Sequence, residues 1–208
     1  MLYRLIYQTQ GRFAAPPMPV ALAVTVKIIS CYLLYLRVSG QFHIIAGMLC
    51  LFGYDMPETN HRYFLAHSVN DMWRRMNIYW KDFMVKIVYF PAYFKLRRKG
   101  ALRAELVSTL LVVVATYVLH AYQFFWIQGK LRLSLNDALF WTILGSVMLA
   151  NVWIEFNSRQ NRPRSSHMSW LRKGAQIAAT FAFMALLWSM WSADSISEWF
   201  YFLRTGNI

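Results

Sequence analysis

The sequence predicts an all-α membrane protein with about four spanning helices and short re-entrant or interfacial helices between them. Of its 208 residues, 58% are hydrophobic and only 15% are charged, whereas an ordinary globular domain is about half apolar and about one-quarter charged. Four stretches have the roughly 20 mostly apolar residues that a helix needs to cross the hydrocarbon core. The net charge of +13 is concentrated in short breaks between these stretches, as in the cytoplasmic loops of membrane proteins.

The predicted spans differ in the ionisable residues that they carry. Lys27 interrupts the first span, whereas the second has no Asp, Glu, Lys or Arg but contains His120. Two strongly basic breaks, 95–103 and 159–173, are separated by two spans, so both are predicted to face the cytoplasm. The second span then runs outward. The four spans are residues 17–38, 106–127, 135–156 and 174–191.

The positive charge does not indicate a nucleic-acid partner. Such a partner requires a soluble domain with Lys and Arg gathered on one face, whereas here these residues flank apolar runs. The predicted partner is the lipid bilayer, and residues 1–208 are predicted to form a single membrane domain. At the start of the chain, Tyr3 and Tyr7 beside Arg4 predict an interfacial segment.

Residues 39–105, between the first two spans, are predicted to contain shorter elements. The apolar run 39–53 is short and glycine-rich, which predicts a short or re-entrant helix. Ser68 follows a polar loop and is typical of a helix N-cap, so a helix is predicted over 69–83. The aromatic segment after it is predicted to lie at the membrane interface, and Pro91 is predicted to end or kink that segment.

His120 lies deep in the second span, roughly 20 Å from its cytoplasmic end at about 1.5 Å per residue. A polar seam is predicted to turn it toward the protein interior, because the seam residues are spaced by 7, 4 and 3 and fall within about 60° of the helix surface. An ionisable residue at this depth indicates a functional site. The alternative is a structural hydrogen bond to a neighbouring helix. The seam consists of Thr109, Thr116, His120 and Gln123.

A helix over 69–83 would place two indoles and two amides on one face, because their spacings of 3, 4 and 3 residues follow the helical repeat. One carboxylate of this segment can hold Arg75 while another cation meets an anionic ligand, such as a phosphate-bearing acyl carrier. The alternative is an interfacial helix anchored by Trp and Arg. The face consists of Asn70, Trp73, Asn77 and Trp80, and the carboxylates are Asp71 and Asp82.

The cysteines and the other histidines predict neither a metal site nor a disulfide framework. Cys31 and Cys50 lie in apolar surroundings without a CxxC spacing, which favours a structural role. The histidines apart from His120 are scattered without metal-ligand spacing, and each is predicted to be a surface or structural residue. They are His43, His61, His67 and His167.

An ordered series of short motifs resembles the C-terminal half of the membrane-bound O-acyltransferase family, in its bacterial branch. Each motif by itself is unspecific, but their order and spacing agree with the family over 15–127, and best over 35–127, while 128–208 continue only its pattern of spanning helices. The motifs are Ser39-Gly40 with Gly47, Gly53 to Asn60 with Pro57, Tyr63 with Ala66 and Ser68, Trp73-Arg74-Arg75, Lys81-Asp82, Tyr89-Phe90-Pro91, and His120.

The resemblance implies an enzyme of the bacterial inner membrane that moves an acyl group from a cytoplasmic thioester, acyl-CoA or an acyl-carrier protein, to a hydroxyl of an envelope sugar, polymer or lipid. It implies no bound cofactor. His120 would be the catalytic base and Asn77 the second catalytic residue, a hydrogen-bond donor to the thioester carbonyl. The residues implied to wall the site or bind the acyl donor are Trp73, Arg74, Arg75, Trp80 and Asp82.

Three departures from the family pattern leave the acceptor open. Met76-Asn77 stands where the bacterial branch has Trp-His, His43 replaces an expected Asp, and Leu119-His120-Ala121 replaces Trp-His-Gly. Family members are also roughly twice as long, so a partner chain is expected to supply the missing N-terminal helices if the chain is an incomplete unit. The alternative function is a non-catalytic membrane subunit or scaffold of a transport or assembly complex, in which Lys27 and His120 make buried polar contacts.

Overall fold

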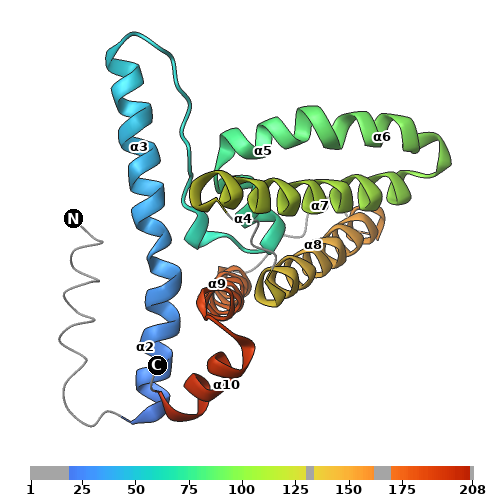
Figure 1. The fold of residues 1–208 in the computed structure, drawn as a ribbon. Helices are drawn as coiled ribbons and strands as arrows, with labels where there is room; N and C mark the ends of the chain where they lie inside the picture. The colour runs from blue at the N-terminus through green and yellow to red at the C-terminus, as the bar shows by residue number, and fades with distance from the viewer. Residues whose placement is uncertain (1–18, 130–133, 162–169, 207–208) are drawn as a thin grey trace. The chain divides into compact units, whose positions relative to one another are not determined.

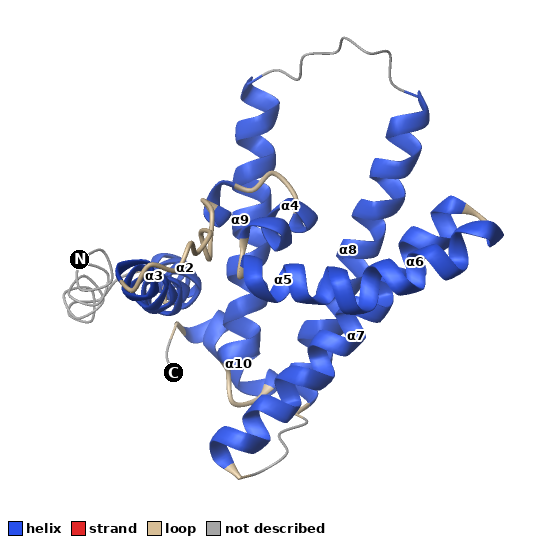
Figure 2. Ribbon diagram, turned by 90° about the horizontal axis from the view of Figure 1, so that it is seen from above, coloured by secondary structure: helices blue, strands red, loops and turns tan. Residues whose placement is uncertain are grey.

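The computed structural model describes residues 19–129, 134–161 and 170–206. These residues form helices and loops and contain no strand (Figure 2). Four helices are long and apolar enough to cross a membrane, namely Val20–Leu51, Ala101–Gln123, Leu135–Arg159 and Trp170–Ser192. The predicted fold class, an all-α polytopic protein with four spans, is therefore confirmed.

The elements group by their contacts into two compact units. One unit contains the described residues up to Asn60 together with those from Phe181 onward, and the other is His61–Thr180. The single domain over 1–208 remains a prediction. The elements, coloured in chain order in Figure 1, are α2 Val20–Leu33, α3 Tyr35–Leu51, η1 Tyr63–Leu65, α4 Val69–Arg75, α5 Ile78–Met84, the π-helical turn η2 Val85–Tyr89, α6 Phe90–Leu96, η3 Arg97–Lys99, α7 Ala101–Gln128, α8 Leu135–Asn161, α9 Trp170–Ser192 and α10 Ile196–Thr205.

Several sequence predictions fall outside the described residues. They concern the interfacial segment near Tyr3, Arg4 and Tyr7, and basic-loop residues Arg162, Arg164 and His167.

The short or re-entrant helix predicted over 39–53 is not a separate element, because residues 39–51 belong to the longer helix α3 that continues from α2. The chain continues from α2 into α3 with helical backbone at Leu34 (φ −58°, ψ −24°), so that Val20–Leu51 form one long helical segment. The glycines in α3 do not end it, because a helical glycine costs only about 1 kcal/mol relative to alanine. The segment ends at Gly53, whose φ of +87° lies in the left-handed region that glycine readily adopts.

The prediction of one continuous helix over 69–83 is wrong. The side chain of Ser68 caps α4 as predicted, accepting a hydrogen bond from the Asp71 N–H at 3.1 Å. However, α4 ends at Arg75, whose carbonyl accepts the His61 N–H at 2.8 Å instead of serving a further helical turn. Asn77 then takes the left-handed conformation (φ +45°, ψ +62°) before α5 begins. Asn70 and Trp73 therefore belong to a different helix from Trp80.

Pro91 does not end the helical segment in which it lies. Proline lacks the N–H that would pair with the carbonyl four residues before it, and its ring crowds that carbonyl. The chain accommodates this with the π-helical turn η2, directly before α6. A π-turn is wider by one residue and is a common way to absorb such a mismatch. The helical course then continues to Leu96.

In the unit His61–Thr180, α6 lies along α7, and α8 packs against the same long helix (Figure 1). Val112 and Val113 of α7 and Leu144 of α8 are buried, and Val113 lies against Gly145 of α8. Gly145 allows this approach, because a Cβ atom at its position would lie 2.9 Å from Val113 Cγ1. The close approach of Val113 to residue 145 therefore depends on the absence of a side chain there.

Gly145→Ala is expected to lower the thermal unfolding midpoint of the purified protein, because Val113 must move to admit the methyl group. Overpacking of this kind costs about 1–3 kcal/mol. Val113→Ala in the same chain should recover part of the loss. The matched control is Gly47→Ala, where nothing lies within 4 Å of the added Cβ. Equal midpoints for Gly145→Ala and the unmodified protein would contradict this account of the α7–α8 contact.

In the other unit, the second half of α9 packs on α2 and α3 through aromatic rings. The Tyr32 ring lies 5.3 Å from that of Phe181 and 5.9 Å from that of Trp188, and Tyr35 lies 5.4 Å from Trp188. Tyr32 is almost completely buried. α10 follows α9 and contacts α2. Its N-cap is Ser195, whose side chain accepts a hydrogen bond from the Glu198 N–H.

Candidate functional site

His120 on α7 lies between two tryptophan rings from different helices. Its imidazole centroid is 5.2 Å from the Trp141 ring on α8 and 6.3 Å from the Trp80 ring on α5. The His120 side chain is half-buried. Three elements thus converge on one imidazole, which fixes its position more firmly than a lone polar residue facing lipid.

The polar seam of α7 is buried only as far as His120. Thr109 and Thr116 are buried as predicted, whereas Gln123 is exposed in the described structure. The Thr116 hydroxyl, one turn from His120, is fully buried and has no hydrogen-bond partner among the described residues. The Thr116 hydroxyl could therefore form a hydrogen bond with a molecule bound next to the imidazole.

Trp80 adds a second unused polar group at this place. Its indole Nε1 is buried and has no hydrogen-bond acceptor among the described residues. A buried donor without an acceptor costs about 1–3 kcal/mol, so native structures rarely keep one without a reason. An acceptor atom in a bound molecule, next to His120, would satisfy it.

Asn77 immediately precedes the helix that carries Trp80. It is one of two non-glycine residues with positive φ in the described part of the chain, the other being Arg62. Asparagine is among the side chains that tolerate this conformation best. The left-handed backbone at residue 77 is therefore one reason for an asparagine at this position, and helical spacing did not reveal it. The catalytic role that the resemblance implies would be a second reason.

Two cations of α4 and α5 have carboxylate partners within their own helices. Arg75 Nε lies 2.8 Å from Asp71 Oδ1, one of the two carboxylates predicted as its partner. Lys81 Nζ lies 2.6 Å from Asp82 Oδ1, and about half of the Asp82 side chain is exposed. Trp73, on α4, is half-buried. α4 is held against α8 by a hydrogen bond from Asn70 Nδ2 to the Met148 carbonyl at 3.3 Å.

A chain of ion pairs joins α4, α7 and α8. Arg74 lies 3.6 Å from Glu155, and Arg159 lies 3.7 Å from both Glu155 and Glu105. Burial raises the pKa of the nearby Tyr89 hydroxyl, and the Glu105 charge raises it further. Arg74 is more than half exposed, so it is the most accessible of the arginines predicted to meet an anionic donor.

Asp71 connects the loop before α4 to the helix itself. Its carboxylate accepts hydrogen bonds from Arg75 and from the His67 N–H at 3.2 Å. Burial alone would raise the pKa of this carboxyl, but these two hydrogen bonds and the charges of His67 and Arg75 hold the pKa below its ordinary value. Its ionised form is therefore the one that the fold prefers.

Because the pKa of Asp71 is lowered by folding, its contribution to stability is present above the unfolded-state pKa of about 3.9 and is lost as the pH falls through the folded-state value. We expect the thermal midpoint to drop as the pH is taken from about 5 to below about 4. Asp71→Asn should reduce stability at neutral pH by about 1.5–3 kcal/mol and flatten this pH dependence. Asp82→Asn, which removes an exposed carboxylate, is the control and should change neither. An unchanged pH profile in Asp71→Asn would exclude this role.

Two neighbours of His120 were missed by sequence reasoning. The Trp141 ring lies 5.2 Å from its imidazole in a tilted arrangement, and the buried Asp137, one turn earlier on α8, lies close enough to interact electrostatically with His120. The Asp137 carboxylate accepts hydrogen bonds from the N–H and hydroxyl of Ser134. The spacing of four between Asp137 and Trp141 was the available signal, since it places both residues on one face of the helix.

A groove between α7 and α8 opens beside this site. It has a volume of about 250 Å³, and its walls are mostly apolar. Trp141 belongs both to this groove and to the surroundings of His120. The groove is lined by Leu110, Val113, Val114, Tyr117, Ala138, Trp141, Thr142, Gly145, Ser146 and Leu149.

The site thus combines one imidazole, two indoles, a buried hydroxyl and a nearby carboxylate on three helices. This set can accept a proton and donate hydrogen bonds within largely apolar surroundings. Comparisons with protein-family models, with curated proteins and with solved structures give no match for this chain.

Proposed function

We propose that this chain is a membrane-embedded O-acyltransferase, or the catalytic half of one, that transfers an acyl group from a cytoplasmic thioester to a hydroxyl acceptor of the cell envelope. One observation carries the proposal. The His120 imidazole, in a stretch of α7 (106–127) that has no Asp, Glu, Lys or Arg, is held between Trp80 and Trp141 beside a buried indole N–H that has no acceptor among the described residues.

The proposed reaction uses His120 as a general base. Its imidazole takes the proton of the acceptor hydroxyl as the hydroxyl oxygen attacks the thioester carbonyl carbon. The new C–O bond forms, the C–S bond breaks, and the imidazolium returns the proton to the departing thiolate, so that an ester and a free thiol leave the site. Proton transfer by a positioned side chain typically contributes about 10²–10⁴-fold to the rate.

Hydrogen-bond donors are needed where negative charge develops on the thioester carbonyl oxygen. The Trp80 Nε1–H supports this assignment because it is buried, unused among the described residues and carried by the ring next to His120. The Asn77 amide is the donor that the family resemblance implies. The apolar groove between α7 and α8 offers hydrocarbon-compatible walls beside the same ring system.

The setting of the reaction is also a proposal. The ordered motifs resemble a bacterial family of the inner membrane, with acyl-CoA or an acyl-carrier protein as donor and a sugar, polymer or lipid as acceptor. The chain presents four helices that can span a membrane, and a partner chain would supply further helices if the unit is incomplete.

A non-catalytic role has one observation in its favour. The rings of Trp80, His120 and Trp141 join α5, α7 and α8, and a scaffold would benefit from such packing without any chemistry. Under this alternative, the imidazole contributes its packing between the two indole rings, and its basicity is irrelevant.

Acyl transfer measured on reconstituted protein separates the two functions. The full chain, alone and co-expressed with the products of adjacent genes, is placed in vesicles with radiolabelled acyl thioesters and an envelope fraction as acceptor. Label should move into a product that mild base hydrolyses, as expected of an ester. Thioester hydrolysis without ester formation in every combination would favour the scaffold.

A further inference from the structure

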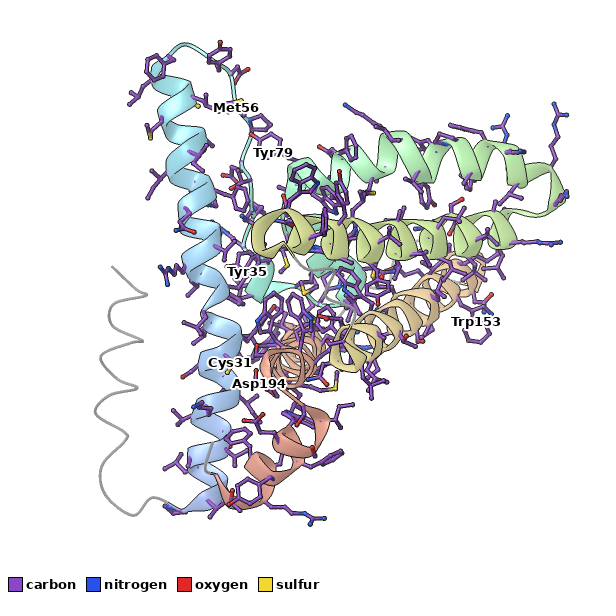
Figure 3. All side chains as sticks on the ribbon, viewed as in Figure 1. Cys31, Tyr35, Met56, Tyr79, Trp153 and Asp194 are labelled. Atoms are coloured by element: carbon purple, nitrogen blue, oxygen red, sulfur yellow. The ribbon has the colours of Figure 1, made fainter. Side chains whose placement is uncertain are left out.

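A small pocket in the other unit contains charged groups that the proposed acyl transfer does not use. It has a volume of about 110 Å³ and lies where α2, the end of α9 and α10 meet. Cys31 and Asp194, both labelled in Figure 3, belong to its wall. The complete lining is Lys27, Cys31, Ser189, Ser192, Ala193, Asp194, Glu198, Trp199 and Phe202.

The pocket lies at the edge of the membrane rather than in its centre. α9 has 23 residues that can span a membrane and ends at Ser192. At about 1.5 Å per residue such a helix just exceeds a hydrocarbon core of about 30 Å, so its end lies near the headgroups. Asp194 and Glu198 follow that end directly, and Lys27 is at the same level because it lines the same pocket. By the predicted orientation, this is the outer side.

The helix after the pocket is suited to the headgroup region. α10 carries a run of aromatic residues, of which Phe200 and Tyr201 are exposed. Exposed aromatic rings on a short amphipathic helix favour the boundary between hydrocarbon and water. Trp199 instead points back to the protein, and its Nε1 donates to Ser189 Oγ at 3.0 Å. This bond fixes one wall of the pocket.

The charges of the pocket are separated and available. Lys27 supplies an ammonium group, and Asp194 and Glu198 supply two carboxylates. Among the described residues, the structure records no ion pair between Lys27 and either carboxylate. Lys27 and Asp194 are both exposed, whereas Glu198 is half-buried. A bound group that carries both signs of charge would pair with all three.

We propose that this pocket binds the headgroup of phosphatidylethanolamine from the adjacent leaflet. The lipid phosphate pairs with the Lys27 ammonium, and the lipid ammonium donates hydrogen bonds to the carboxylates of Asp194 and Glu198. A volume of about 110 Å³ admits a small polar group but not acyl chains, which stay in the bilayer. Phosphatidylglycerol lacks the cation, and phosphatidylcholine has a bulkier cation without N–H donors, so both should bind more weakly.

The test measures lipid binding, so its outcome does not depend on acyl transfer. The purified full chain in detergent is titrated with each of the three lipids and with soluble phosphoethanolamine, and binding is followed by native mass spectrometry. We expect phosphatidylethanolamine to bind at least about tenfold more tightly than the others. Lys27→Ala should weaken its binding at least about tenfold, whereas Lys173→Ala, at the opposite end of α9, should not.

The carboxylates are tested by a second variant that does not depend on Lys27. The double variant Asp194→Asn, Glu198→Gln should reduce phosphatidylethanolamine binding to the level of phosphatidylglycerol binding and leave phosphatidylglycerol binding unchanged.

The cysteines provide an internal control, because Cys31 lines the pocket and Cys50 lies exposed on α3. Phosphatidylethanolamine should slow alkylation of Cys31 several-fold without affecting Cys50.

Three results would overturn the proposal. The first is equal binding of phosphatidylethanolamine and phosphatidylglycerol, and the second is retained lipid selectivity in the double variant. The third is binding of free phosphoethanolamine as tight as that of the lipid, which would make the pocket a site for a soluble zwitterion instead.

Discussion

His120→Gln is expected to lower the rate of acyl transfer by about 10²–10⁴-fold, the contribution typical of a positioned general base. Glutamine keeps a polar group of similar length between Trp80 and Trp141, but its amide cannot take the acceptor proton at neutral pH. Initial rates of ester formation in vesicles, at saturating thioester, measure the loss. His120→Ala should be equally inactive, because both variants remove the same proton acceptor.

Stability separates a lost base from a damaged fold. His120 is half-buried between two rings, so His120→Gln should leave the thermal midpoint close to that of the unmodified chain. Tyr122→Phe is the matched control. It lies two residues further on α7, roughly 200° around the helix, is exposed, and should retain full activity. Normal transfer by His120→Gln would leave the imidazole only a packing role and favour the scaffold.

The spans were predictable because crossing a membrane imposes a simple requirement on composition. Length and apolar content fixed α7, α8 and α9 to within a few residues at most ends. The same criterion failed for α3, since a short apolar run with two glycines has the composition of a re-entrant helix. Whether such a run joins the preceding helix depends on the backbone at Leu34, where neither proline nor a cap interrupts it.

The break between α4 and α5 was not predictable from periodicity. A hydrogen bond from the His61 N–H, which comes from the loop before η1, takes the Arg75 carbonyl out of the helical pattern. Local spacing contains no information about that partner. By contrast, the Ser68 cap and the ion pair of Arg75 are contacts between near neighbours in sequence. The cap was predicted correctly, and Asp71 is one of the two carboxylates that were predicted as partners of Arg75.

The candidate site was predictable in its centre but not in its surroundings. An ionisable residue deep in an apolar span costs free energy, so its presence indicates a function. This argument singled out His120. Trp141 lies 21 residues further along the chain on the antiparallel neighbour. Its contact with His120 depends on how α7 and α8 are aligned along their axes, and the close approach at Gly145 sets that alignment.

Asn77→Gly is expected to lower acyl transfer by about 10²–10³-fold, the typical loss of one oxyanion donor, in a protein that still folds. Glycine adopts the left-handed backbone of residue 77 at least as readily as asparagine, so this substitution removes the amide and keeps the turn before Trp80. Asn77→Ala is a poorer test, because a Cβ without a compensating side-chain interaction costs about 1–2 kcal/mol in this conformation. Its activity would fall whichever role Asn77 has.

Arg62→Gly provides the control for Asn77→Gly, because Arg62 has nearly the same backbone (φ +44°) and no assigned chemistry. It should be at least as stable as the unmodified chain and fully active. If Asn77→Gly is also fully active, the asparagine is present for its backbone, and the donor to the thioester carbonyl must be sought elsewhere. The buried Nε1 of Trp80 is then the next candidate, and Trp80→Phe, which keeps an aromatic ring beside His120 and removes the N–H, would become the decisive variant.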